Sequence, residues 1–285
     1  MAKYEVKADL HNHLRNWDDN LSSLDVKKVV AKVEKNIGRG AYVGIEGWDS
    51  DDTRVEQFFE AMKRAYGDKL SCHENALYLP EKDIWLVSGQ EVFADDNGHQ
   101  SHIVVLGIKP GMKLKYGRTI EDTLKEARDL GAISFLAHPF SLGGAGKVLT
   151  SDSEKERRIL SLADAMEVYN GQAALWLPPI LPRKANERAR EYFESVKDQY
   201  PNFGALINSD GHNVYEVGKS YTTLEMPQPT GTAKAGELIS ELRRAINSSK
   251  SPTGKCTPSR TGTMINAAQI AVRDIILPKL HLRKK

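Results

Sequence analysis

Five of the eight histidines of this chain stand at one end of a short apolar run. The first two, His11 and His13, form the motif DLHNH directly after the run that starts at Tyr4. In an extended backbone, side chains at positions i and i+2 point the same way, so these two imidazoles can bind one cation. A single pair of this kind also fits the plainer interpretation of two hydrogen-bonded histidines.

Four further motifs place a metal-capable side chain in or at the end of an apolar run. They are GQE with Glu91, SHIVVLG with His102, FLAHPF with His138, and INSDGH with Asp210 and His212. A carboxylate inside the apolar run VSGQEVF would be costly to bury without a cation or another partner, and a carboxylate can bridge two metal ions. Each motif alone fits a hydrogen-bonded histidine or a loop aspartate, whereas together they indicate one shared site for divalent cations.

The elements that must position these residues alternate between short apolar runs and stretches of helical period. Strands are predicted over Tyr4–Leu10, Ala41–Gly47, Ile84–Phe93, His102–Ile108, Ala132–Ala137, Ala165–Tyr169, Phe203–Asn208 and Ser220–Met226. Helices are predicted over Leu24–Ile37, Val55–Tyr66, Ile120–Leu130, Arg183–Tyr200 and Gly236–Ile246. This alternation is typical of βαβ units in an α/β protein with a mainly parallel sheet. We therefore expect a closed or nearly closed barrel whose active face lies at the carboxyl ends of the strands.

Composition limits the classes of function. The 285 residues are 40% hydrophobic and 27% charged, which is ordinary for a globular protein and excludes disordered and fibrous classes. No apolar run reaches the roughly 20 residues of a spanning helix, and the first residues do not form a signal peptide, so we expect a cytoplasmic protein without a membrane partner. The only cysteines are Cys72 and Cys256, so a metal site must use nitrogen and oxygen ligands.

One barrel domain is expected over residues 1–264, followed by a C-terminal helix and basic tail over residues 265–285. The final helix is predicted over Ile265–Ile276, and the closing LHLRKK is interpreted as a solvated terminus. The segment SLGGAGKVLT over residues 141–150 is rich in glycine and could form a mobile flap over a substrate. Residues 248–262 are expected to form a loop.

In their order and spacing, these motifs resemble the PHP domain, a family named for polymerases and histidinol phosphatase. The matching segments are DLHNH, GQEV, HIVVLG, AHPF, EVYNG and NSDGH, followed by GKSYTTL, and they cover most of the chain. The resemblance implies a distorted (β/α)7 TIM-like barrel with two or three divalent metal ions in its mouth. It also implies hydrolysis of phosphomonoesters or of nucleic-acid phosphodiesters.

The resemblance further implies a set of metal ligands. The first ion would be held by His11, His13, Glu91 and Asp210, the second by Glu91, His102 and His138, and a third by His212 with other residues. The family usually supplies the third ion with a T-D-H motif after the second strand, and this chain has GIEGWDSDD there. That departure puts the third ion in doubt.

Substitutes for the missing T-D-H ligands lie nearby. Asp49 is the nearest after the second strand, and Asp18 or Asp19 could serve after His13. A third site of two carboxylates and one histidine would favour Mn²⁺ or Mg²⁺ over Zn²⁺, while Fe also remains a candidate for the cluster. The alternative is that the acidic residues 49–52 only cap the helix that follows.

The expected reaction is hydrolysis of a phosphate ester. Two neighbouring cations lower the pKa of a bridging water to give a hydroxide nucleophile, and they polarise the phosphoryl oxygens. We assign catalytic roles to Asp210 and His212, because a leaving alkoxide could be protonated through water near His212. Arg15 and Lys219 are candidates to bind the phosphate, although a basic loop residue can also be simply solvated.

The near-neutral net charge of +2 favours a small phosphorylated metabolite or a nucleotide as the substrate, because a polynucleotide track needs several Lys and Arg along one groove. One alternative is a nuclease or exonuclease that acts on single strands. A second is a catalytically weakened metal-binding module, which the missing T-D-H supports. A third alternative is a metal-dependent amidohydrolase. That class usually needs a lysine or carboxylated lysine ligand at a strand end, and none of the predicted strands here ends in a lysine. The natural substrate and the oligomeric state are not indicated.

Overall fold

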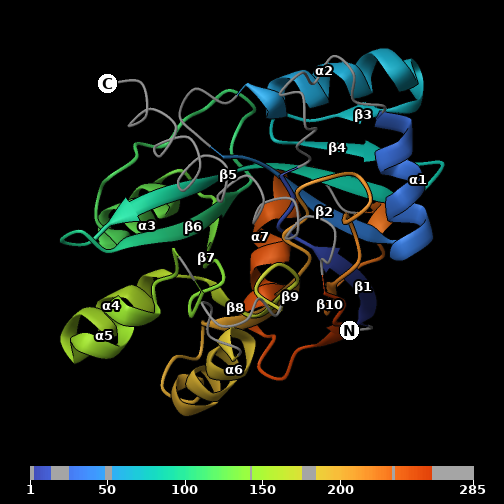
Figure 1. Ribbon diagram of the computed structural model, residues 1–285. Helices are drawn as coiled ribbons and strands as arrows, with labels where there is room; N and C mark the ends of the chain where they lie inside the picture. Colours follow the sequence, from blue (N-terminus) through green and yellow to red (C-terminus); the bar gives the residue numbers. More distant parts are fainter. Residues whose placement is uncertain are drawn as a thin grey trace, which may run out of the picture.

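The computed structural model describes residues 3–13, 26–48, 53–141, 143–174, 184–232 and 235–258. One strongly curved sheet forms the centre of the molecule, and most of the helices lie around its outside (Figure 1). The helices α1 (Val26–Asn36) and α2 (Arg54–Tyr66) gather at one side of the sheet, and α3 (Ile120–Asp129), α4 (Gly146–Ser151) and α5 (Ser153–Leu162) gather at the opposite side (Figure 1). This is a mixed α/β architecture with a nearly closed barrel.

The wall of the barrel runs through strands from both halves of the chain. In spatial order these are β1 (Tyr4–Asp9), β2 (Ala41–Gly47), β5 (Ile84–Asp95), β6 (Gln100–Leu106), β7 (Ile133–Leu136), β8 (Ala165–Asn170) and β9 (Gly204–Asn208). Every neighbouring pair is parallel except the two that involve β6, which is antiparallel to β5 and to β7. Because β6 runs in the opposite direction, its first residues lie at the same edge as the carboxyl ends of the other strands.

Four further strands extend this wall. They are β10 (Tyr221–Met226) antiparallel on β1, β11 (Thr253–Lys255) antiparallel on β10, β4 (Ala76–Leu79) antiparallel on β5, and β3 (Ser71–Cys72) antiparallel on β4. The sheet order therefore starts at β11 and ends at β9.

Side chains, more than backbone pairing, close the barrel between β9 and the pair β1 and β10. The Thr222 hydroxyl accepts a hydrogen bond from Ile207 N at 2.7 Å, and the Asn208 side-chain oxygen accepts one from Leu10 N at 2.8 Å. Beyond the strand ends, Asn12 and Gly211 form an isolated parallel bridge. This bridge holds the segment after β1 against the segment after β9, which are about two hundred residues apart in sequence.

Helices form where apolar residues recur with a period near 3.6. Their bounds are α1 Val26–Asn36, α2 Arg54–Tyr66, α3 Ile120–Asp129, α4 Gly146–Ser151, α5 Ser153–Leu162, α6 Ala185–Val196 and α7 Ala235–Asn247. Two starts are capped by side chains: Thr119 accepts from Asp122 N, and Asp152 accepts from Glu154 N and Lys155 N. Among the described residues, no helix has the length and apolar character needed to span a membrane.

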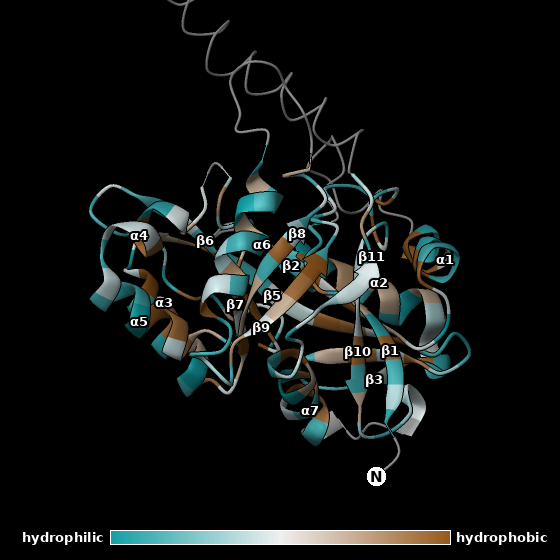
Figure 2. Cartoon of the chain, turned by 90° about the horizontal axis from the view of Figure 1, so that it is seen from below, coloured by the Kyte–Doolittle hydropathy of each residue, from teal (hydrophilic) through white to brown (hydrophobic). Residues whose placement is uncertain are grey.

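Hydrophobic residues concentrate on the central strands, whereas the surrounding helices carry many hydrophilic residues (Figure 2). Strand residues alternate between two sides, so that Val43 and Ile45 of β2 pack with helices α1 and α2 while Tyr42 joins another core. That second core also holds Phe135 and residues of α7. The His11 ring lies 6.4 Å from the Phe135 ring, so this core lies directly beneath the side chains of the candidate site.

The predicted α/β barrel class is confirmed. All eight predicted strands and all five helices predicted before residue 259 are present, with bounds that differ by a few residues. The strands β3, β4 and β11 and the helices α4 and α5 were not predicted, and β11 lies in a segment expected to be a loop. The predicted helix over 265–276 and the tail to 285 lie outside the described residues, so the division at residue 264 stays a prediction.

Candidate metal centre

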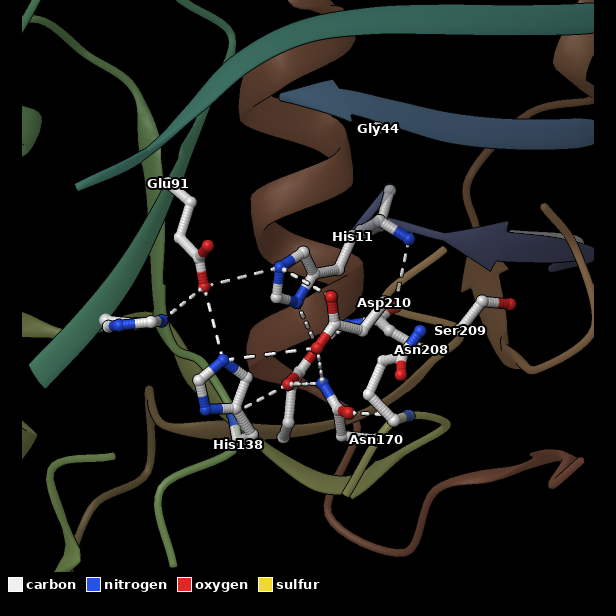
Figure 3. A network of polar contacts seen from close by, with 12 residues as sticks. His11, Gly44, Glu91, His138, Asn170, Asn208, Ser209 and Asp210 are labelled. Carbon is white, nitrogen blue, oxygen red and sulfur yellow. Dashed lines mark hydrogen bonds and ion pairs between the residues drawn. The ribbon is translucent and has the colours of Figure 1, made fainter. Parts of the chain in front are cut away.

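One edge of the barrel collects the candidate ligands. His11 and His13 follow β1, His138 follows β7, and Asp210 and His212 follow β9. Glu91 lies in β5, and His102 lies near the start of the antiparallel strand β6. In Figure 3 the imidazoles of His11 and His138 both point toward the carboxylate of Glu91. The structure thus brings seven of the predicted ligands together from five strands.

Glu91 lies at the centre of this group. Its Oε1 atom is 3.0 Å from His102 Nδ1, 3.2 Å from His138 Nε2 and 3.5 Å from His11 Nε2. Its other oxygen, Oε2, is 3.2 Å from His13 Nε2. A carboxylate with imidazoles on both oxygens is suited to bridge two cations.

Asp210 approaches the same imidazoles from the opposite side. Its Oδ1 atom is 3.6 Å from His11 Nε2, 3.7 Å from His13 Nε2 and 3.4 Å from His212 Nδ1. Its Oδ2 atom is 4.0 Å from His138 Nε2. Asp210 therefore links the histidines after β1 to the histidine in its own loop.

Within the described part of the chain, the potential ligands form three overlapping groups, and in each group the ligand atoms lie within 4.8 Å of one another. These groups are His11 with His13 and Glu91, Glu91 with His102 and His138, and His13 with Asp210 and His212. His11 Nε2 and His13 Nε2 face each other at 3.1 Å, and the buried Oδ1 of Asp210 has no hydrogen-bond partner among the described residues. Two imidazole nitrogens that face each other and a buried carboxylate oxygen without a partner are the arrangement expected where nitrogen and oxygen ligands hold a divalent cation.

Burial and mutual attraction shift the pKa values of these groups. Burial opposes ionisation of Glu91, yet the neighbouring histidines hold its pKa well below the ordinary value. The same balance brings the pKa of Asp210 to about 2. Burial opposes the charged form of His11 too, but Asp210 and Glu167 raise the pKa of His11 well above its ordinary value. Such strongly shifted pKa values concentrate at functional sites.

Two of the candidate ligands have unusual backbone conformations. His138 has φ of 28° and Asp210 has φ of 50°, in the region that L-residues rarely adopt. Such a strained backbone persists only where surrounding contacts hold it, and strained residues are common at functional sites. It indicates that the fold holds both side chains in place.

A second layer of polar groups orients the ligands, and sequence analysis missed its central residue, Glu167 in β8. The Glu167 carboxylate accepts hydrogen bonds from His11 Nδ1 at 2.9 Å, from the backbone N–H of His138 at 2.7 Å, from Asn170 Nδ2 at 2.7 Å and from Asn208 Nδ2 at 2.9 Å. With Nδ1 as the donor, His11 turns its Nε2 lone pair toward the site. The same signal that singled out Glu91, a carboxylate inside an apolar strand, is present in AMEVYN.

Two more buried acids support the loops of the site. Asp9 accepts from Ser209 N at 2.9 Å and from Gly218 N at 2.7 Å, which ties β1 to the loop of Asp210, and burial raises the pKa of Asp9 to about 7. Glu46 accepts from Asn12 N at 2.6 Å, between the two histidines of DLHNH, and burial raises the pKa of Glu46 well above its ordinary value. Sequence analysis assigned a role to neither residue.

Of the other predicted site residues, Lys219 lies among the described residues and does not belong to the three ligand groups. Lys219 lies in the same loop as Asp210, and its described hydrogen bond is from its backbone N–H to Glu216 O. Arg15, Asp18, Asp19 and Asp49 lie outside the described residues. The binding role of Lys219 and the catalytic roles of Asp210 and His212 therefore stay predictions, as does metal binding by each ligand.

Comparison with families and individual sequences gives limited information. No family model matches this chain. A segment of 100 residues is 29% identical to uncharacterized protein MJ0417 of Methanocaldococcus jannaschii and covers 35% of this chain and 37% of that protein.

Solved structures share the fold at low sequence identity. PsfC from Pseudomonas syringae PB-5123 has a TM-score of 0.54 at 14% identity and covers 95% of this chain and 99% of its own. Endonuclease Q bound to a 27-mer duplex with an abasic lesion at its active site has a TM-score of 0.53 at 14% identity over 88% of this chain. Our chain spans 58% of that endonuclease chain. At these identities the likeness concerns the fold alone.

Proposed function

We propose that this protein is a metal-dependent phosphoesterase of the PHP-domain type. The observation on which the proposal depends is the convergence on Glu91 of imidazoles from His11, His102 and His138, which come from three different strands. The low pKa of Glu91 keeps it anionic at neutral pH, as a bridging ligand must be. The ordered motifs from DLHNH to NSDGH support the same family.

Divalent ions bound by these residues would lower the pKa of a water molecule and polarise the phosphoryl group. The protein's own residues hold the ligand side chains in position. Glu167 sets the orientation of His11 through Nδ1, and the Asn12–Gly211 bridge holds the DLHNH segment against Asp210. His212 Nδ1 lies 2.9 Å from the carbonyl oxygen of Asp210, which orients the ring in a partly exposed position from which it can pass a proton to a leaving alkoxide.

A small phosphorylated metabolite or a nucleotide is our proposed substrate class, because the net charge of +2 does not favour polynucleotides. The structural likeness to Endonuclease Q supports a second candidate, cleavage of nucleic acid. The five imidazoles of the described ligand groups suit Zn²⁺ or Fe, whereas a third site completed by Asp49, or by Asp18 or Asp19, would favour Mn²⁺ or Mg²⁺.

The test is a metal analysis combined with a substrate panel. Protein purified without chelator is analysed for bound metals, stripped, and reloaded separately with Mn²⁺, Zn²⁺, Mg²⁺ and Fe²⁺. Each form is offered p-nitrophenyl phosphate, bis-p-nitrophenyl phosphate, a 5′-mononucleotide and a short single-stranded oligonucleotide, at low and high salt. We expect metal-dependent release of phosphate or nitrophenol. Bound metal without hydrolysis of any of these esters would contradict the proposal and support a non-catalytic metal-binding module.

A further inference from the structure

Three aromatic side chains, Trp48, Phe93 and Tyr116, line one side of the candidate metal centre, and we call them the aromatic wall. Trp48 directly follows β2, and Phe93 lies in β5 two residues after Glu91, on the same side of the strand. The Trp48 and Phe93 rings lie 6.5 Å apart at an interplanar angle of 17°, and the Phe93 and Tyr116 rings lie 5.5 Å apart at 75°. The wall is partly exposed at all three residues.

The wall borders the open side of the centre. His11 and Glu91 have side chains that are 0% and 2% exposed, whereas those of His102 and His212 are 13% and 10% exposed. His102 and His212 are therefore more accessible to a substrate than His11 and Glu91 are. The wall contacts both of these ligands, since Phe93 lies 4.3 Å from the His102 ring and Trp48 lies 5.0 Å from the His212 ring.

Hydrogen bonds keep the wall in position without a ligand. The Tyr116 hydroxyl donates to the backbone oxygen of Trp48 and, at 3.1 Å, to the backbone oxygen of Glu91. It thereby ties the segment after β2 to the strand of the central carboxylate. A preorganised aromatic surface loses little entropy when a ring packs on it.

We propose that the aromatic wall binds a planar ring of the substrate, so that the preferred substrates are nucleotides whose base packs on the wall while the phosphate lies at the metal ligands. This inference rests on the proposed function. Aromatic surfaces accept any base, because every base presents a π-face, and they add little for a sugar phosphate that has no ring. The wall thus favours nucleotides among the small phosphate esters without specifying which base.

The activity test compares AMP with ribose 5-phosphate, two esters with the same reacting phosphate. In the Mn²⁺-loaded protein we expect kcat/KM to be about 5- to 100-fold higher for AMP, the range given by stacking on one or two rings. In Trp48→Leu the ratio should fall to within about twofold, mainly through a higher KM for AMP, whereas Trp48→Phe should keep most of it. Tyr4→Leu removes an exposed aromatic ring at the far end of β1 and should leave the ratio unchanged.

A binding test separates this inference from the proposed function. AMP should quench the tryptophan fluorescence of the wild type and of Tyr4→Leu, ribose 5-phosphate should not, and Trp48→Phe should lose most of the quenching. Quenching by AMP without hydrolysis of either ester would overturn the proposed function and leave the ring site standing. Equal kcat/KM for both esters in the wild type, or a Trp48→Leu variant that slows both equally, would overturn the ring site and indicate that Trp48 only packs against the ligands.

Discussion

At the scale of single residues, the centre contains buried polar atoms that have no hydrogen-bond partner among the described residues and that a shared cation could satisfy. His138 illustrates this, because its imidazole contacts Glu91 through Nε2 while its buried Nδ1 has no hydrogen-bond partner among the described residues. Its side chain therefore contacts the other ligands of the centre rather than the rest of the fold. Its role should be visible in metal binding and activity, and much less in stability.

We expect His138→Ala to lower metal-dependent hydrolysis by at least about 100-fold, because loss of a direct ligand should exceed the 10- to 100-fold effect typical of residues behind the ligands. The circular dichroism spectrum of the metal-free protein should stay close to wild type, and any decrease in its melting temperature should shrink as pH rises, because the ion pair with Glu91 requires a protonated His138. The comparison variant is His73→Ala, whose ring packs against Trp85 away from the ligand groups. Unchanged metal content and activity in His138→Ala would exclude His138 as a ligand.

Glu167 allows a test of orientation as distinct from ligation. Glu167→Gln keeps the shape of the side chain, but the amide cannot accept from His11 Nδ1, His138 N and both asparagines at once. We expect about a 10- to 100-fold loss of metal affinity in competition with a fluorescent chelator. Glu241→Gln, a change at a buried glutamate of α7 that bonds Gln228, should leave the affinity unchanged. Equal affinities in both variants would show that Glu167 is not needed to orient His11.

At the scale of elements, the sequence predicts those whose periodicity is long enough to be distinctive. The strands β1, β2 and β5 through β10 are apolar runs bounded by turn residues, and helices such as α3 have caps and a regular apolar stripe. The strands β3 and β11 span only two and three residues and are mostly exposed, so they leave no apolar pattern. The helix α4 was hidden because its first residue is Gly146, in a segment whose glycines favour a loop.

The candidate site likewise contains residues that the sequence predicts and residues that it does not. Motifs at strand ends identify seven side chains that converge, and the antiparallel direction of β6 explains why His102 belongs with them although it lies near the start of its strand. Glu167, Asp9 and Glu46 act through hydrogen bonds to residues up to about two hundred positions away, and a single sequence does not indicate such partners. The wall formed by Trp48, Phe93 and Tyr116 also depends on tertiary geometry.

The loop between β7 and α4 was expected to be a flap, and the described part of it is packed directly on a ligand. Gly143 O accepts a hydrogen bond from His102 N at 2.9 Å, and a Cβ atom on Gly143 would lie 2.7 Å from His102 Nε2. Gly143 also has φ of +73°. Any side chain at this position would therefore press on the imidazole of His102.

We expect Gly143→Ala to displace His102 and to reduce metal-dependent activity by about 10-fold or more, the order seen when a residue behind a ligand is lost. Gly131→Ala is the matched control, because Gly131 has φ of +68° and nothing within 4 Å of its Cβ position. Both changes carry the backbone strain of an alanine at positive φ, so their difference in activity isolates the contact with His102. Equal activities in the two variants would show that the ring can move aside freely.

At the scale of the whole molecule, the site couples metal binding to the closure of the barrel. The Asn12–Gly211 bridge and the hydrogen bonds between β9, β1 and β10 hold together segments from the two ends of the described chain. Cations bound between His11, Glu91 and Asp210 would stabilise the same closure. Ions that bind only the folded state raise its stability by about 2.7 kcal/mol at 100 times the dissociation constant, which corresponds to a melting temperature about 5 °C higher.

This coupling must depend on pH, and the sign follows from the pKa shifts. Asp210 and Glu167 raise the pKa of His11 above that of the unfolded chain, so the stability that His11 contributes is complete below about pH 6.5 and is lost as pH rises through the folded value. Glu91 raises the pKa of His138, with the same consequence. Burial raises the pKa of Asp9 to about 7, which also lowers stability as pH rises toward that value. The lowered pKa values of Glu91 and Asp210 act only at acidic pH.

The metal-free protein should therefore become less stable between pH 6.5 and pH 8. Metal binding has the opposite dependence, because the ions bind neutral imidazoles and must displace the protons of His11 and His138. We expect the increase in melting temperature on addition of Mn²⁺ to widen across this interval, with a smaller increase in His138→Ala at every pH. Differential scanning fluorimetry at fixed free Mn²⁺, with a chelator in the metal-free arm, measures both curves. If the difference in melting temperature between the Mn²⁺ arm and the chelator arm narrows as pH rises, Mn²⁺ binds elsewhere and does not displace protons from these two histidines.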